Sequence, residues 1–245
     1  MLFKPPLVIG GFGDQGRYPI SAQVFSATSD KQEIYKLRYR AFTQAGWIAP
    51  DDTGVLRDSF DDLPTAYSIG AFYNGDCVGS LRLAFGGANG ARGLMPCELF
   101  FPDETGAILS GTITRTVEFS RMAVDPGIAA KTFRAVIYAS LVRAGLILTY
   151  ANEADFAFAA VHRKMSRFYE IMCGFRLIAQ SASYGSIAEP THLLGRDLVA
   201  LDRRRQARNA FFRIQPEEID DARDLLAKFE SEDKHSRIAG AKLRA

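Results

Sequence analysis

The alternation of hydrophobic and polar positions predicts a chain built mainly from short strands. Asn74-Gly75 stands between two alternating runs and is a strong signal for a two-residue hairpin turn. The run over 114–124 carries charged residues among β-branched and apolar neighbours, as a buried central strand would. The predicted strands cover residues 23–27, 67–73, 77–85, 114–124, 155–161, 175–180 and 192–198.

Apolar residues spaced by three and four positions predict helices between these strands. Ser29 with Gln32 is interpreted as a capping box that opens the first helix, and Gly46 is expected to end it. Residues 86–113 are expected to form a glycine-rich loop. The predicted helices cover residues 29–45, 131–150, 164–172 and an amphipathic tail from 215, whose last residues are expected to be disordered.

The order of these elements favours one α+β domain over a doubly wound fold. A chain of 245 residues is long enough for one large domain with its own core. Residues 1–20, rich in glycine and proline, are predicted to be an irregular arm. The domain itself is expected over 21–200, and a helical extension with a tail over 201–245.

Composition narrows the function classes. A formal net charge of +2 argues against nucleic-acid binding, and the arginine cluster at 203–208 is interpreted as a solvated run. Three widely separated cysteines indicate neither a disulfide framework nor a metal site, and they fit a reducing compartment. Without a signal-peptide core or a membrane-spanning run, the sequence predicts a cytoplasmic protein.

Several charged residues fall where a core is expected. Arg38 shares a helix face with apolar positions, so its guanidinium needs a carboxylate partner, and Asp58 and Asp61 follow soon after. The alternative is that Arg38 extends along the surface into solvent. Glu118 and Arg121 lie inside the predicted central strand. Buried charges of both signs indicate a functional cleft or a structural ion-pair network.

Two segments together resemble the GNAT acyltransferase superfamily: the strand and helix over 117–134, and the run from Arg167 to Phe175. Within it, one residue pattern is similar to that of acyl-homoserine-lactone synthases and N-acyl amino acid synthases. The resemblance implies a three-layer α+β fold, a mostly antiparallel twisted sheet flanked by helices, and acyl transfer from a thioester to an amine. The matching residues are Arg38, Phe42, Trp47, Asp58, Asp61, Arg82, Glu118 and Arg121.

The resemblance also implies how the acyl donor is held. In this superfamily the turn after the central strand offers backbone N–H groups to the donor's phosphates. Val124 stands where the usual coenzyme A signature has Gln or Arg, which favours acyl carrier protein, with its phosphopantetheine arm, and no tightly bound cofactor. Lys131, Arg134 and Arg143 are candidates for contact with that acidic carrier, or else solvated helix residues. The donor-binding candidates are Val124, Gly127, Ile128, Ala129, Ala130, Lys131 and Arg134.

The chemistry requires a base, because an amine acceptor arrives as an ammonium ion. Glu118 is the candidate base, and the alternative is a structural ion pair with Arg82 or Arg121. Backbone N–H groups around Met122 and Ala123 are candidates for holding the oxyanion. Tyr169 stands where many relatives place an acid for the leaving thiolate, although packing is the commoner role. The candidates for substrate binding are Arg38, Phe42, Trp47, Asp58, Asp61, Arg82 and Arg121, while His162, His192 and Cys173 are interpreted as ordinary loop or core residues.

These interpretations favour an N-acyl amino acid synthase that uses acyl carrier protein and a small amino acid. The chain is longer than is usual for the lactone synthases and keeps the Gly174-Phe175 ending. Three alternatives remain open: an acyl-homoserine-lactone synthase, an acetyl-coenzyme A-dependent N-acetyltransferase, and a non-catalytic acyl-binding module.

Overall fold

The computed structural model describes residues 19–87, 93–110, 113, 115–181, 184–185, 187, 190–198 and 213–242, with side chains as far as Asp233 in the last range. The predicted arm up to residue 18 and the arginine cluster at 203–208 lie outside the described residues.

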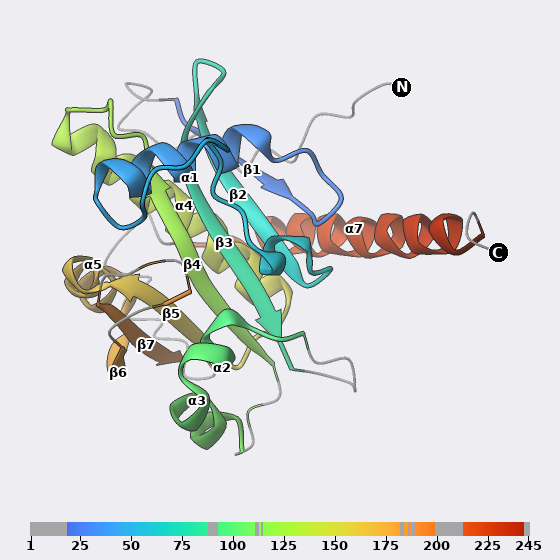
Figure 1. Cartoon of the computed structure of the whole chain (residues 1–245). Coiled ribbons are helices and arrows are strands. Elements are labelled where there is room, and N and C mark those ends of the chain that lie inside the picture. The colour runs from blue at the N-terminus through green and yellow to red at the C-terminus, as the bar shows by residue number, and fades with distance from the viewer. Residues whose placement is uncertain are drawn as a thin grey trace.

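A single seven-stranded sheet forms the centre of the molecule, in the order β1-β2-β3-β4-β5-β7-β6 (Figure 1). Strands β4 and β5 run parallel, and all other neighbours are antiparallel. This confirms the mostly antiparallel sheet. The strands are β1 (Ser21–Phe25), β2 (Ala66–Tyr73), β3 (Asp76–Gly86), β4 (Thr116–Val124), β5 (Phe156–His162), β6 (Arg176–Ser181) and β7 (Thr191–Asp197).

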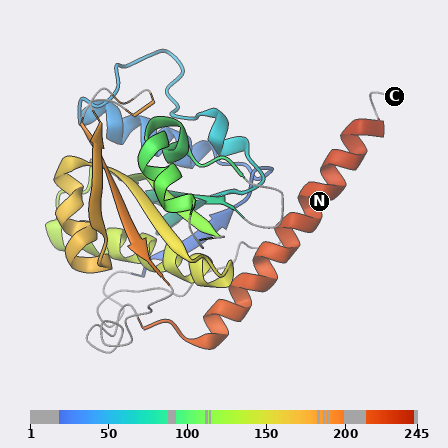
Figure 2. The same cartoon turned by 90° about the horizontal axis from the view of Figure 1, so that it is seen from below.

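Helices cover both faces of the sheet (Figures 1 and 2). Along β3 successive side chains point to opposite faces. Leu81 and Leu83 therefore join the core under α4, whereas Arg82 points toward the charged groups beside α1. The helices are α1 (Gln32–Gln44), α2 (Pro96–Phe100), α3 (Pro102–Leu109), α4 (Lys131–Ala151), α5 (Arg163–Phe168) with a π-helical turn η3 (Tyr169–Cys173), α7 (Pro216–Lys242) and the short 3-10 turn η2 (Ser59–Asp62).

Helix α4 is the central helix of the core. Its residues from Ser140 to Thr149 are all buried, and it is long and apolar enough to cross a membrane by length and composition alone. Since 67% of that apolar stretch is buried by the rest of the protein, the hydrophobicity is explained by packing on the sheet. Gly145 allows this close approach: a Cβ there would lie 2.6 Å from Cε1 of Phe119.

Helix α7 begins against α4 and then runs out beyond the sheet (Figure 2). Ala222 and Leu226 are buried, and the ring of Phe229 stacks on Tyr67 with centroids 6.0 Å apart. These residues belong to the predicted apolar stripe. The helix continues to Lys242, and the last residues, 243–245, for which disorder is expected, lie outside the described residues.

Two local predictions are wrong. The capping box does not form, because Ser29 Oγ accepts the N–H of Ser26 at 3.1 Å and α1 begins after Lys31 without a side-chain cap. The expected loop before β4 instead contains α2 and α3, each with a proline in its first turn. Proline fits that position because the first N–H groups of a helix need no intrahelical partner.

Candidate active site

The sheet opens between its two parallel strands. Strands β4 and β5 pair only from Thr116 with Phe156 to Phe119 with Ala159, and both strands continue beyond that point. On its other side β4 bulges: Ser80 opposes Ala123 and Arg82 opposes Ser120, so two residues of β4 face Leu81. Arg121 in the bulge has φ 54°, a conformation that is rare for residues other than glycine. The local geometry therefore turns β4 away from β5.

A space of about 600 Å³, called here the inner cavity, lies in this opening. Its walls come from the bulge of β4, the end of β5, the residues after α1 and the segment before β7. The lining residues are Phe42, Trp47, Ser120, Arg121, Met122, Tyr138, Ala160, Val161, His162, Met165, Tyr169, Tyr184, Ile187 and Thr191.

A second space of about 860 Å³, called here the outer groove, adjoins the inner cavity. Both are lined by Phe42, Trp47, Met122, Tyr138 and Met165. The outer groove extends past Ala123 and Val124 to the basic side chains of Arg134 and Lys164. The two spaces together lead from the surface to the bulge of β4.

The turn before α4 stands beside this groove. The stretch from Gly127 to Lys131 is exposed except for half-buried Ile128, and it does not line the groove. Ala130, at the helix N-cap, makes no side-chain cap hydrogen bond, so N–H groups of the first turn remain for an anion. Arg134 braces the turn by donating to the carbonyl oxygens of Asp125 at 3.1 Å and Ile128 at 3.4 Å.

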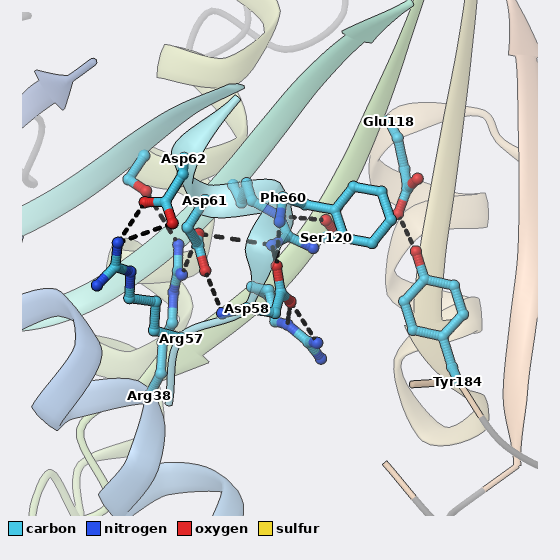
Figure 3. Close-up of polar contacts among 12 residues, drawn as sticks. Arg38, Arg57, Asp58, Phe60, Asp61, Asp62, Glu118, Ser120 and Tyr184 are labelled. Carbon is cyan, nitrogen blue, oxygen red and sulfur yellow. Dashed lines mark hydrogen bonds and ion pairs between the residues drawn. The ribbon is translucent and has the colours of Figure 1, made fainter. Parts of the chain in front are cut away.

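The predicted arginines and aspartates form one connected network of ion pairs (Figure 3). Arg38 Nη1 lies 2.8 Å from Asp61 Oδ1, so the surface alternative for Arg38 is wrong and its carboxylate partner is confirmed. Arg82 contacts Asp58 at 2.6 Å and Asp61 at 3.5 Å. Arg121 donates from Nε and Nη2 to Asp58 Oδ2 at 3.1 and 2.6 Å.

Local backbone structure places the two aspartates. The Asp58 carboxylate caps η2, and the Asp61 carboxylate accepts a hydrogen bond from the Asp58 N–H. This capping box fixes both carboxylates. Burial alone would raise the pKa of Asp61, but Arg38 and Arg82 outweigh it and hold that pKa well below the usual range. Burial is likewise outweighed at Asp58 by Arg82 and Arg121, and the pKa of Asp58 is lowered.

Arg121 carries this network to the inner cavity. It lines the cavity, is 7% exposed, and its buried Nη1 has no hydrogen-bond partner among the described residues. Three guanidinium groups face two carboxylates in the network, which leaves a net positive charge. This end of the cavity is therefore suited to an anionic group of a ligand.

Glu118 lies behind the cavity wall. It is fully buried, with Oε2 accepting the N–H of Cys97 at 2.6 Å and Oε1 accepting the hydroxyl of Tyr184. Burial raises its pKa, and the bond from Tyr184 and the charge of Arg82 oppose that shift only in part. No ion pair of Glu118 with either arginine occurs in the part of the chain described, so the structural alternative is wrong in that form.

Three further candidates border the two spaces. Met122 lines both, and Ala123 is buried where it lines the outer groove. Tyr169 lines the inner cavity, donates its hydroxyl to Met122 Sδ at 3.6 Å, and packs edge-on against Phe175. Burial raises the pKa of Tyr169 well above its usual value.

Some predicted roles need correction. Arg143 is buried and forms a bidentate ion pair with Glu218 of α7, so its side chain is not available on a surface that could contact the carrier. His162 is the last residue of β5 rather than a loop residue, and its ring stacks on Trp47 with centroids 4.6 Å apart. His162 Nδ1 accepts the N–H of Lys164 at 3.2 Å.

Two residues that line the inner cavity, His162 and Tyr184, were not predicted as site residues, and only His162 had a signal in the sequence. His162 directly follows a predicted strand, and residues at strand ends commonly line sites, so its position was a usable signal. Tyr184 is a lone aromatic residue in a stretch of small residues, with no periodicity to mark it. His192 lies in β7 rather than in a loop, and its Nδ1 is 2.7 Å from Ser166 Oγ. Cys173 is buried in the core, as predicted.

Comparisons with known proteins identify the family and the fold of this chain. The family model of the N-acyl amino acid synthase FeeM matches residues 33–197. The structure of FeeM, an N-acyl amino acid synthase from uncultured soil microbes, is 21% identical with a TM-score of 0.58, covering 80% of this chain and 98% of its own. Comparison with curated protein sequences gave no significant match.

Two signal synthases share the fold at lower identity. The acyl-homoserine-lactone synthase LasI is 18% identical with a TM-score of 0.54, covering 76% of this chain and 95% of its own. BjaI, a coenzyme A-dependent acyl-homoserine-lactone synthase solved with SAM and isopentyl-CoA, is 15% identical with a TM-score of 0.50, covering 83% and 88%. Because the family model spans more than half of the sequence, the chain belongs to the FeeM N-acyl amino acid synthase family of acyltransferases, and it has their GNAT-like fold.

Proposed function

We propose that this acyltransferase moves a fatty acyl group from acyl carrier protein to the α-amine of an amino acid, giving an N-acyl amino acid. The observation that carries the proposal is the unpartnered Nη1 of Arg121 at the inner cavity. A buried guanidinium N–H without a partner, on a side chain that lines a mostly apolar space, is suited to one carboxylate on a small acceptor.

The bidentate contact with Asp58 supports this role, because it fixes the Arg121 guanidinium before the acceptor arrives. Arg38, Arg82 and Asp61 continue the network behind it. Phe42 and Trp47, edge-on to each other with ring centroids 5.1 Å apart, supply apolar wall for the acyl group or the acceptor side chain. A preorganised ion at the end of an apolar site gives orientation as well as affinity.

The donor thioester would enter along the outer groove. Its phosphate would meet the N–H groups at the start of α4, between Gly127 and Lys131. Exposed Lys131 and Lys164 make no ion pair in the described part of the chain, and they offer positive charge to an acidic carrier. Together with Val124, they favour acyl carrier protein over free coenzyme A as the donor. The proposal also keeps the expectation of a cytoplasmic enzyme.

The reaction then needs three contributions from the protein: a base, stabilisation of the oxyanion and an acid for the leaving thiolate. The acceptor ammonium loses a proton to Glu118, and the free amine attacks the thioester carbonyl carbon. Backbone N–H groups at the bulge, around Met122 and Ala123, stabilise the oxyanion. The C–S bond breaks as the carbonyl re-forms. The attacking nitrogen gives up its second proton and the departing thiolate takes up a proton, a transfer for which Tyr169 is the candidate named above.

The extension after residue 200 is proposed to support the domain over 21–200 without taking part in the reaction. Helix α7 contacts α4 through the Arg143 pair with Glu218, and it contacts β2 through the stack of Phe229 on Tyr67. None of its described side chains lines the inner cavity or the outer groove.

A lactone-forming synthase is the second candidate function. The fold shared with LasI and BjaI favours it, and an acceptor such as the SAM bound to BjaI also carries an amine and a carboxylate. An acetyltransferase is less favoured, since Val124 stands where the usual coenzyme A signature has Gln or Arg. A binding-only module would leave the buried Glu118 without a role.

The test is a competition in one tube. Purified protein is given acyl carrier protein and coenzyme A thioesters that carry distinguishable isotopes of the same fatty acyl chain, with amino acids and SAM as acceptors. Mass spectrometry should find N-acyl amino acids labelled mainly from the carrier protein. Acyl-homoserine lactones, products labelled mainly from coenzyme A, or no acylated amine would each contradict the proposal.

A further inference from the structure

Glu118 has no direct contact with the inner cavity. It is 0% exposed and is absent from the cavity lining, while Tyr184 belongs to that lining. Both carboxylate oxygens of Glu118 are already engaged, one by the Cys97 N–H and one by the Tyr184 hydroxyl. Figure 3 shows the phenol of Tyr184 pointing at the carboxylate of Glu118. A proton that leaves an acceptor in the cavity therefore meets Tyr184 first.

Tyr184 is held firmly enough to serve as a fixed contact. Its ring packs against Phe100 and Phe101, with centroids 4.7 and 6.3 Å away. Its backbone exchanges two hydrogen bonds with Ile187, at 3.0 and 3.1 Å. Gly185 between them has φ +61°, which a residue without a Cβ adopts without strain. The turn and the two rings together aim the hydroxyl at Glu118.

We propose that Tyr184 relays the proton from the acceptor ammonium to Glu118, as a further catalytic residue of the acyl transfer proposed above. In the step, the ammonium N–H bond breaks as a new O–H bond forms at Tyr184 Oη. At the same time the original Tyr184 O–H bond breaks and its proton joins Glu118 Oε1. Tyrosine ends neutral, Glu118 ends protonated, and the amine keeps the electron pair with which it attacks the thioester.

The surroundings favour one coupled step over a free tyrosinate. Burial, together with the charge of Glu118, raises the pKa of Tyr184 well above its usual value, so the anion would be costly to form alone. Burial also raises the pKa of Glu118, which makes it a stronger proton acceptor than an exposed carboxylate.

The test compares two acceptors of similar shape and different basicity. Glycine arrives as an ammonium ion, whereas aminooxyacetate carries the same carboxylate beside an oxyamine that is already unprotonated at neutral pH. Tyr184→Phe should lower kcat for glycine by about 100-fold or more, since positioned proton transfer contributes at least that much. The loss with aminooxyacetate should be less than about a tenth of that, because no proton must be removed before attack.

The matched control is Tyr73→Phe, which also removes one phenol but lies outside both spaces. It should leave both acceptors unaffected, and thermal unfolding should show that each variant is folded. Glu118→Gln combined with Tyr184→Phe should be scarcely slower than the slower single variant, because both remove the same proton path.

Equal losses for the two acceptors, an unchanged kcat, or additive effects in the double variant would overturn the relay. The relay and the proposed acceptor fail separately. If the unaltered enzyme acylates SAM but no amino acid, the proposed function fails, and the relay is judged by whether Tyr184→Phe slows that reaction. If the unaltered enzyme acylates no amine at all, both proposals fall.

Discussion

Arg38 Nη1 and Asp61 Oδ1 lie 2.8 Å apart, and neither side chain has any exposed surface. The pair joins α1 to the turn before β2, across 23 positions of sequence. It therefore fixes the turn that holds Asp58, and through Asp58 it fixes the guanidinium of Arg121.

Loss of this buried ion pair should lower the free energy of unfolding far more than loss of a neighbouring exposed ion pair. Asp61→Asn should lower the free energy of unfolding by about 3–5 kcal/mol, because it leaves buried arginines uncompensated. Asp62→Asn is the control, since its pair with Arg57 is about half exposed on both sides and should contribute little to stability. Urea titration measures both, and equal losses would contradict the buried network.

The same carboxylate gives a pH dependence of stability. The pKa of Asp61 is lower in the folded than in the unfolded chain, so its contribution is complete above the unfolded value of about 4. It should be lost as the pH falls below that value toward the depressed folded pKa. Urea midpoints between pH 7 and pH 3 should fall more steeply in the original protein than in Asp61→Asn, and parallel curves would contradict this assignment.

Two glycines in helices should respond in opposite directions to alanine. Gly145→Ala should lower the free energy of unfolding by about 1–3 kcal/mol, since the new Cβ overlaps Phe119 and lies 3.0 Å from Leu81. Gly106→Ala in α3 meets nothing within 4 Å and should raise it by about 0.5–1 kcal/mol through helix propensity. Thermal melts of the pair test the packing of α4, and a stabilised Gly145→Ala would refute it.

Arg121→Lys should weaken binding of the acceptor specifically. Lysine keeps the charge but loses the fork that contacts Asp58 and a carboxylate together, so KM for the amino acid should rise about 10-fold or more. KM for the thioester should change little. Arg143→Lys removes the comparable fork to Glu218 outside both spaces and should affect stability without changing acceptor KM. An unchanged KM in Arg121→Lys would remove Arg121 from acceptor binding.

Residues whose partners follow from local pattern were predictable. Arg38 on an apolar helix face demanded a carboxylate, and Asp61 supplied it. The positions of β4 and α4 followed from the pattern of apolar residues along each element. Such features depend on a few neighbouring residues, so the sequence carries them directly.

Features that depend on distant contacts were not predictable. Ser29 matched a capping box but bonded Ser26, which a pattern cannot weigh against the helix. The sequence around Arg143 is compatible with a solvated helix residue, but α7 places Glu218, 75 positions further along the chain, against it. Tyr184 reaches Glu118 only because β7 pairs with β5, and nothing near it in sequence marks that contact.

The most direct test of the central claim is mass spectrometry of organic extracts from bacteria that express this chain or its Glu118→Gln variant. The account predicts N-acyl amino acids with the original chain, and a reduction of about 100-fold or more with Glu118→Gln at equal protein level. Acyl-homoserine lactones instead, or equal amounts of product from both proteins, would contradict it.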